Sequence, residues 1–233
     1  NETLIERQIK IFHNCNINDI TIVTVYRSEL IDISNVNYVK NENYEKTGMN
    51  ESLFCALKPS NSPILVTYSD IIFEQKIVQQ MLEIIDGIRL AVNLNWKKYY
   101  QNRTMHPLSE AENVLVENGR ILQIRKNISK SLGSQQIGEF LGIMTLSSEH
   151  VKILLERYSY LKKNHMGAFH NSSSLSNAYI TDMLQEIINC GINVNPVFTE
   201  GKWCEIDTPE DLRNAEKSLR TYTGPAKNER EKI

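Results

Sequence analysis

The sequence predicts an α/β protein with a mostly parallel central sheet, helices on both faces and a small β-hairpin arm. Apolar runs of strand length alternate with amphipathic segments of helical period, and this order is typical of a parallel sheet. The chain has 233 residues, of which 41% are hydrophobic and 23% charged, a composition that suits one substantial core. We therefore expect one domain over residues 1–220 and a polar tail over 221–233.

The first half of the chain supplies most of the alternation. Thr3 and Glu6 form a capping-box pattern at the start of a helical segment. The run "SPILVTYSDIIF", residues 62–73, is the strongest strand in the sequence. Helices are expected at residues 3–15, 50–58 and 74–85, and strands at 19–26, 36–41, 62–73 and 88–95.

The second half carries the clearest turn signals. Asn118-Gly119 separates two alternating runs, which predicts a β-hairpin over residues 113–127. Glu200-Gly201 is interpreted as the turn of a second hairpin, over 192–207, and Gly191 as the cap that ends the helix before it. Further helices are expected at 150–164, 177–190 and 208–220, and a further strand at 138–147.

Charge and cysteine usage exclude several classes of protein. The formal net charge is -2 and no basic stripe is present, so the sequence predicts no nucleic-acid partner. No apolar run approaches membrane-spanning length and the start lacks a signal-peptide pattern, so we expect no membrane partner and a cytoplasmic location. The four cysteines are far apart and lack metal-binding spacing, which favours free thiols in a reducing compartment.

Two acids follow predicted strands and are candidates for chemistry. Asp70 closes "ILVTYSD" and Asp207 closes "KWCEID", and ligands of open α/β sheets lie at the carboxyl ends of strands. Thr208 is a good helix cap, so capping does not explain Asp207; Asp70 could equally be a strand-end acid that accepts backbone hydrogen bonds. Two such acids aimed into one cleft suit Mg²⁺ that also holds the phosphates of a nucleotide.

An ordered set of segments carries a family resemblance. The segments are "TLIERQIKIFHNCNINDITIVTVYR", "YEKTGMNESLFCAL", "ILVTYSDIIFE", "RTMHPLSEAE", "GRILQIRKN" and "WCEIDTPEDL". In this order they resemble the small-molecule nucleotidyltransferases, and in particular the cytidylyltransferases that act on phosphocholine, on phosphonates and on phosphoglutamine in capsular phosphoramidate synthesis. The resemblance implies a Rossmann-like nucleotidyltransferase fold and transfer of CMP from CTP to a phosphate or phosphonate oxygen, with release of pyrophosphate.

The resemblance also implies roles for individual residues. Asp70 and Asp207 match the Mg²⁺-binding acids, and Lys126 and Arg103 match residues that contact phosphate and acceptor. An exposed hairpin lysine and a solvated loop arginine are the plain alternatives for the last two. The nucleotide-binding set is Thr47, Gly48, Met49, Asn50, Ser52 and Ser69, for which a simple Asn or Ser helix cap is the alternative. The acceptor-binding set is Glu139, His170, Asn171, Asp182 and Glu205.

Alternatives remain open for part of this acceptor set and for the other aromatic and histidine residues. A solvated helix-face acid competes for Asp182, and structural hydrogen bonds compete for Glu139 and Glu205. Trp203 is expected to be a core aromatic. The remaining histidines, His13, His106, His150 and His165, are expected to be surface or internally satisfied residues.

One departure from the family bears on activity. The family signature opens with a strand and a Gly-x-Gly-x-Arg turn upstream of "TLIERQ", and we expect that this segment is missing from the sequence given rather than from the protein. A non-catalytic nucleotidyltransferase-like module and a sugar-phosphate nucleotidyltransferase using UTP or dTTP are the competing functions. Phosphoglutamine is the first choice of acceptor, before phosphocholine and 2-aminoethylphosphonate, and a homodimer is possible.

Overall fold

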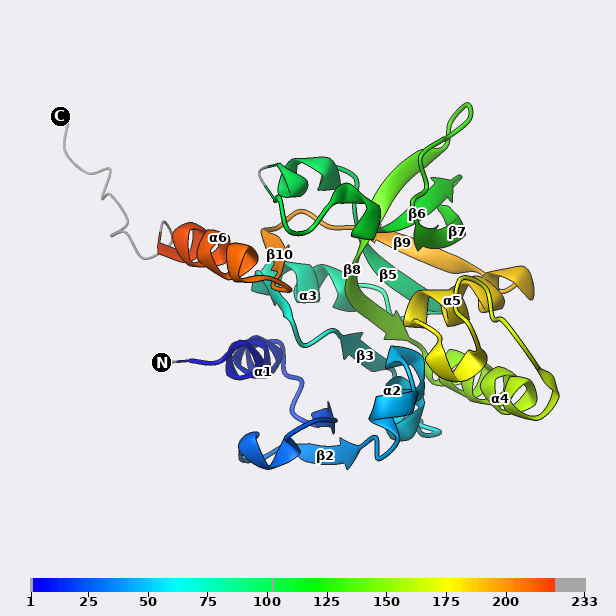
Figure 1. The fold of residues 1–233 in the computed structure, drawn as a ribbon, viewed down its shortest axis with the longest axis horizontal. Helices are drawn as coiled ribbons and strands as arrows, with labels where there is room; N and C mark the ends of the chain where they lie inside the picture. Colours follow the sequence, from blue (N-terminus) through cyan, green and yellow to red (C-terminus); the bar gives the residue numbers. More distant parts are fainter. Residues whose placement is uncertain (1, 102, 221–233) are drawn as a thin grey trace.

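The computed structural model describes residues 2–101 and 103–220, and for 218–220 only the backbone. Figure 1 shows a curled central sheet with helices around it. The helices are α1 (Leu4–Asn14), α2 (Met49–Ala56), α3 (Gln75–Leu82), α4 (Ser148–Asn164), α5 (Ile180–Asn189) and α6 (Pro209–Arg220). The strands are β1 (Thr21–Thr24), β2 (Asn37–Lys40), β3 (Ile64–Thr67), β4 (Ile71–Phe73), β5 (Ile88–Asn93), β6 (Glu112–Glu117), β7 (Arg120–Lys126), β8 (Gln136–Leu146), β9 (Val194–Phe198) and β10 (Trp203–Glu205). The predicted α/β class is confirmed, and the predicted tail over 221–233 lies outside the described residues.

The long strand β8 organises the sheet and is buried on both faces. Phe140 and Met144 pack into a core with α4 and α5, whereas Leu141 and Ile143 pack into a core with α1 and α3. Side chains on a strand point alternately to opposite faces, so this division means that helices cover both faces of the sheet. The two cores fix β8 as the central strand.

The prediction of a mostly parallel sheet is wrong for the strand pairings. The order in the central sheet is β7-β6-β8-β5-β9, and β3 also pairs with β8. Strand β8 is antiparallel to β3, β5 and β6, and the parallel pairing within this sheet joins β5 to β9. Strands β3 and β5 do run in the same direction, as βαβ alternation predicts, but β8 lies between them and reverses each pairing.

The first predicted hairpin is confirmed, and the second is wrong. Strands β6 and β7 pair antiparallel around Asn118 and Gly119, whose φ angles are 50° and 74°, as a tight primed turn requires. Strands β9 and β10 do not pair with each other: β9 pairs with β5, and β10 pairs antiparallel with β4. The Glu200-Gly201 segment is therefore a crossing between two sheets, where Gly201 packs against Ile77 of α3.

Helix ends agree closely with the sequence signals. The capping box of Thr3 and Glu6 at α1 is present in full, and Gly191 adopts a positive φ of 81° just after α5. The predicted strand over 62–73 is instead two short strands, β3 and β4, separated by the turn that holds Asp70. Nowhere in residues 2–101 and 103–220 does a helix have the length and apolar character needed to cross a membrane.

Candidate functional site

Asp70 and Asp207 come together because β4 and β10 pair antiparallel. Glu205, the last residue of β10, is in register with Ile71, the first residue of β4, and the N–H of Ile206 donates to the carbonyl oxygen of Asp70 at 2.8 Å. Asp70 therefore precedes one strand while Asp207 follows its partner, and both lie at the same end of this two-stranded sheet. The predicted meeting of the two acids is present, although it does not arise at the ends of parallel strands.

A side chain of α1 holds the turn that carries Asp70. The Nε2 of Gln8 donates to the carbonyl oxygens of Tyr68, at 3.0 Å, and Ile71, at 2.8 Å, one on each side of Ser69-Asp70. Gln8 is 6% exposed, and a buried amide is retained only where its hydrogen bonds are made. Gln8 therefore fixes the backbone on which Asp70 is mounted.

Asp70, Glu205 and Asp207 form what we call the acid cluster. Burial and the charge of Asp207 raise the pKa of Asp70, and its Oδ1 is buried without a partner among the described residues. Burial and the charges of Asp207 and Asp70 raise the pKa of Glu205 to about 8. Carboxylates that repel one another in a partly buried site are stabilised by a cation.

His106, expected to be a surface or internally satisfied histidine, contacts the acid cluster. Its Nδ1 lies 2.9 Å from Asp207 Oδ2 and its Nε2 lies 3.6 Å from Glu205 Oε2. The three side chains offer ligand atoms within 4.8 Å of one another. Burial and the nearby Arg103 lower the pKa of His106, which favours the neutral ring. A neutral ring beside Asp207 can hold the carboxylate in position, while the oxygen donors of Asp70 and Asp207 suit a hard cation such as Mg²⁺.

Glu205 of the acid cluster also lines a small cavity of about 20 Å³ that we call the glutamate cavity. Its lining includes four glutamates and two tyrosines, namely Glu110, Glu112, Glu139, Glu205, Tyr68 and Tyr100. The ring of Tyr68 reaches this position because it lies over Gly142, where a Cβ would come within 2.7 Å of the ring. Trp203 also lines the cavity, but it is 5% exposed and donates to Leu141, as expected of a core aromatic.

The two predicted cationic residues flank this cavity and are both ion-paired. Lys126 Nζ lies 2.7 Å from Glu110, and Arg103 Nε lies 2.7 Å from Asp211. The Arg103 side chain is only 7% exposed, so its alternative as a solvated loop arginine is wrong. Burial alone would lower the Arg103 pKa, but the hydrogen bond and charge of Asp211 raise it. Arg103 Nη2 is buried without a partner in the described part of the chain.

The predicted nucleotide-binding segment packs against the loop before α5. Gly48 donates to Ser176, and a Cβ on Gly48 would lie 2.7 Å from the carbonyl oxygen of Ala178. The glycine is thus needed for close approach of protein backbone. A side-chain cap at α2 is not formed within the described residues, because the cap position is Gly48 itself, so the alternative of an Asn or Ser cap is wrong.

The polar side chains of this segment differ in their bonding. Thr47 and Ser52 both accept from Asn41 Nδ2, at 3.0 Å each. Asn50 is fully buried, and neither its Oδ1 nor its Nδ2 has a partner within the described chain. Met49 and Ser69 are exposed. Asn50 therefore stands out as an amide with an unused donor group and an unused acceptor.

Asp182 joins part of the 165–178 loop, including the predicted acceptor residue Asn171, to the start of α5. Its carboxylate accepts from Asn171 N at 3.1 Å, Ser172 Oγ at 2.6 Å and Tyr179 N at 3.0 Å. Asp182 is 2% exposed, so its alternative as a solvated helix-face acid is wrong. These bonds close the loop onto the first turn of α5, which gives Asp182 a structural task whatever else it does.

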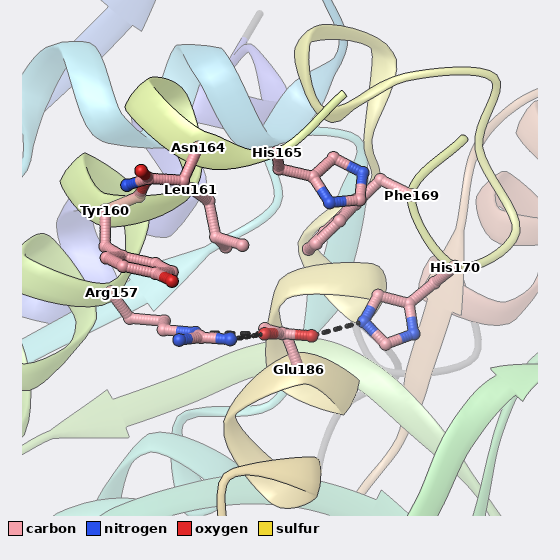
Figure 2. A pocket seen from close by; sticks show the side chains of 8 residues that line it. All are labelled: Arg157, Tyr160, Leu161, Asn164, His165, Phe169, His170 and Glu186. Atoms are coloured by element: carbon pink, nitrogen blue, oxygen red, sulfur yellow. Dashed lines mark hydrogen bonds and ion pairs between the residues drawn. The ribbon is translucent and has the colours of Figure 1, made fainter. Parts of the chain in front are cut away.

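His170 faces a larger, separate cavity of about 390 Å³ between α4, the loop and α5. Figure 2 shows Glu186 between Arg157 and His170, with His165 and Phe169 above His170 in this view. Glu186 Oε2 lies 2.9 Å from His170 Nε2, and Glu186 also pairs with Arg157. The structure thus turns His170 toward Glu186, whereas Asn171 and Asp182 belong to the loop closure.

Several residues of the site were not found by sequence reasoning. Glu112, Tyr68 and Tyr100 read as ordinary strand or loop residues, and His106 read as a surface or satisfied histidine. Glu112 and Glu139 lie on adjacent strands, β6 and β8, which are joined only by long-range pairing. Of these missed residues, only Glu112 could have been suspected from the sequence, because an acid at the first position of an apolar strand is unusual.

The chain is similar to several known proteins. A curated relative, the CTP:phosphoglutamine cytidylyltransferase of Campylobacter jejuni subsp. jejuni serotype O:2, is 26% identical over 226 residues, which cover 91% of this chain and 86% of the relative. Two solved structures share the fold. The inositol-1-phosphate CTP transferase of T. maritima has a TM-score of 0.67 at 17% identity, covering 94% of this chain and 82% of its own. The CTP:phosphocholine cytidylyltransferase of Streptococcus pneumoniae has a TM-score of 0.66 at 19% identity, covering 93% and 85%.

The family itself is established by a direct match. Residues 1–129 match the MobA-like NTP transferase domain. This is more than half of the 233 residues, and it confirms the nucleotidyltransferase fold predicted from the ordered motifs. The chain belongs to the MobA-like NTP transferase domain family.

Proposed function

We propose that this protein is a cytidylyltransferase that transfers CMP from CTP to a small phosphorylated acceptor and releases pyrophosphate. The observation that carries the proposal is the acid cluster, in which Asp70 has an unpartnered buried oxygen beside Asp207. Membership of an NTP transferase family gives these acids a matching task. The named activity of the Campylobacter relative supports CTP as donor and phosphoglutamine as acceptor.

Asp70 and Asp207 are the proposed ligands of Mg²⁺. Their oxygens are hard donors, and burial together with mutual repulsion raises the Asp70 pKa, an energetic cost that a divalent cation would relieve. When bound, the ion would supply neutralisation of charge on the triphosphate. Gln8 and His106 would act as positioning residues, Gln8 on the Asp70 turn and His106 on the Asp207 carboxylate.

The remaining steps need positioning more than covalent help from the protein. An oxygen of the acceptor phosphate attacks the α-phosphorus of CTP in line with the leaving pyrophosphate. Arg103 and Lys126 are the proposed cationic contacts of the phosphates, supported by the unpartnered Arg103 Nη2 and by the 38% exposed Lys126 side chain. Asn50 is the proposed contact of cytosine, whose edge requires both a donor and an acceptor.

The test is a pyrophosphate-release assay of the full-length protein with each of CTP, UTP, dTTP and ATP. Phosphoglutamine, phosphocholine, 2-aminoethylphosphonate and glucose 1-phosphate are the acceptors, with Mg²⁺ present. We expect release that depends on both CTP and an acceptor, with phosphoglutamine the best. Release from UTP or dTTP with glucose 1-phosphate would assign a sugar-phosphate nucleotidyltransferase, and no release from any pair would assign a non-catalytic module.

A further inference from the structure

Two carboxyl groups of the glutamate cavity, those of Glu139 and Glu112, have no direct cationic partner among the described residues. Glu139 is 2% exposed; its Oε1 accepts from the Tyr100 hydroxyl, and its Oε2 is buried without a partner among residues 2–101 and 103–220. Glu112 accepts from the hydroxyls of Tyr68, at 3.0 Å, and Thr181, at 3.2 Å. The groups that donate to these two carboxylates are thus neutral hydroxyls.

The cations nearest to the cavity are already engaged at its edge. Arg103 donates to Asp211 and Lys126 to Glu110, as described above. Their charges lower the pKa values of Glu139 and Glu112 respectively, but burial outweighs them. The pKa of Glu139 is raised to about 8 and that of Glu112 to about 7. A buried oxygen without a partner, on a residue that lines an acidic cavity, is a site that a cationic group can complete.

The size of the cavity restricts what that group can be. A volume of about 20 Å³ is room for about one water-sized group, since one such group needs roughly 10–15 Å³. A primary ammonium places a single heavy atom there and offers three N–H donors to carboxylate oxygens. A trimethylammonium places four heavy atoms there and offers no donor, so it fits neither the volume nor the unpartnered oxygen.

We propose that the glutamate cavity binds a primary ammonium group of the acceptor, with Glu139 and Glu112 as its ligands. This inference rests on the proposed function, and it selects amino-bearing acceptors over quaternary and uncharged ones. The position suits such a substrate: Glu205 lines the cavity and also interacts electrostatically with Asp70 and Asp207. An acceptor with its ammonium in the cavity would extend its phosphate toward the acid cluster and the flanking cations.

The experiment compares acceptors that differ only in this group. The first pair is phosphoglutamine and N-acetylphosphoglutamine; the second is phosphoethanolamine and propyl phosphate, with phosphocholine as the enlarged form. We expect kcat/KM for CMP transfer to fall at least about 30-fold when the ammonium is acetylated or replaced by methyl, the usual scale for a buried charge pair. Phosphocholine is expected to be as poor as propyl phosphate.

A variant tests whether the preference for amino-bearing acceptors arises in the glutamate cavity. Glu139→Gln keeps the acceptor for the Tyr100 hydroxyl but removes the charge, so KM should rise about 30-fold or more for the amino acceptor and change little for its uncharged partner. The matched control is Glu83→Gln, an exposed glutamate beyond α3, which should change neither. If Glu139→Gln does not fold, as judged by circular dichroism, Glu112→Gln serves in its place.

The outcomes separate this inference from the proposed function. If no acceptor supports pyrophosphate release from CTP, the proposed function fails, and the inference fails with it. If CMP transfer occurs but both members of each pair react within about 3-fold of each other, the proposed function stands and the ammonium site is wrong. An equal rise in KM for the amino acceptor and for its uncharged partner in Glu139→Gln would also overturn the ammonium site, because a merely structural role of Glu139 predicts that result.

Discussion

Glu139 and Asp182 are both 2% exposed, but the protein uses these two buried carboxylates in opposite ways. Asp182 accepts three hydrogen bonds that close the 165–178 loop onto α5. Glu139 leaves one oxygen buried without a partner in the described chain, and Asp70 in the nearby acid cluster does the same. The hydrogen bonds of Asp182 stabilise the fold and account for its burial. The unpartnered oxygen of Glu139 lowers the stability of the fold instead, because a buried acid without a partner is unfavourable.

The difference separates structural acids from ligand acids. A carboxylate whose oxygens are all used within the protein stabilises the fold and has little left for a substrate. One that retains an unused oxygen makes the protein less stable than it could be, which is typical of binding and catalytic sites. The sequence predicted roles at Asp70, Asp182 and Asp207 alike, and only the hydrogen bonds distinguish them.

Removing charge from the acid cluster should have the largest effect on activity. For Asp207→Asn and Asp70→Asn we expect kcat to fall about 1000-fold, equivalent to about 4 kcal/mol of transition-state stabilisation, the scale of metal-ion catalysis. The free energy of unfolding should stay unchanged or rise, because each substitution removes repulsion between two acids. Pyrophosphate release and urea denaturation measure the two quantities on the same preparations.

Either of two results would contradict the distinction between structural acids and ligand acids. Near wild-type turnover in Asp207→Asn would remove the metal assignment from that residue. A loss of several kcal/mol of stability would show that the acids are structural after all. Asp86→Asn, an exposed acid paired with Arg89, is the matched control and should change neither quantity appreciably.

Removing Asp182 should have the opposite effect, which is to lower stability while leaving activity largely unchanged. Asp182→Ala leaves Asn171 N, Ser172 Oγ and Tyr179 N without their acceptor, so we expect the free energy of unfolding to fall by about 3 kcal/mol. Acceptor KM, measured at a temperature where the variant is still folded, should change less than about 3-fold. Exposed Glu156→Ala on α4 is the control.

A substrate contact at Asp182 would give a different result. In that case the variant would raise the acceptor KM 10-fold or more while its denaturation midpoint stayed close to that of the wild type. Such a result would restore the role that the family resemblance assigns to Asp182, and it would show that satisfied hydrogen bonds are not a reliable mark of a structural acid in this fold.

Local signals predicted the local parts of this structure. The capping box at Thr3, the turn at Asn118-Gly119 and the cap at Gly191 all depend on a few neighbouring residues, and all are present. The Glu200-Gly201 turn failed because its flanking strands have better partners, β5 and β4, far away in the sequence. A turn signal reports what the backbone can do, whereas strand pairing depends on the competition among distant strands.

The candidate site also divides into features set by neighbouring residues, which could be predicted, and features set by distant residues, which could not. The proximity of Asp70 and Asp207 could be predicted because each residue interrupts or ends an apolar run, a pattern visible within a few residues. Glu112, Tyr68 and Tyr100 could not, because their contacts cross between β3, β6, β8 and the segment after β5. The ion pairs of Arg103 and Lys126 could not be predicted either, because each joins residues from separate segments of the chain.

The smallest predicted effect is a difference in pH dependence between the two regions. Burial raises the pKa of Glu139 to about 8, so the folded protein holds a proton that the unfolded chain releases above about pH 4.5. Between these values the free energy of unfolding therefore falls as the pH rises. Glu112 acts in the same direction, while His106, with its lowered pKa, acts against them just below its ordinary pKa of about 6.5.

Glu186 should behave in the opposite way. Burial alone would raise its pKa, but the hydrogen bonds from Arg157 and His170 lower it, so its contribution is present above about pH 4.5 and is lost on acidification. We therefore expect the melting temperature of Glu139→Gln to improve relative to wild type as pH rises from 5 to 8. That of Glu186→Gln should be lower throughout this range and approach wild type only near pH 4. Thermal melts in a chelating buffer measure both. Parallel pH profiles for the two variants would show that the regions do not differ in how they hold their acids, whereas opposite profiles mark Glu139 as the carboxylate that folding leaves uncompensated.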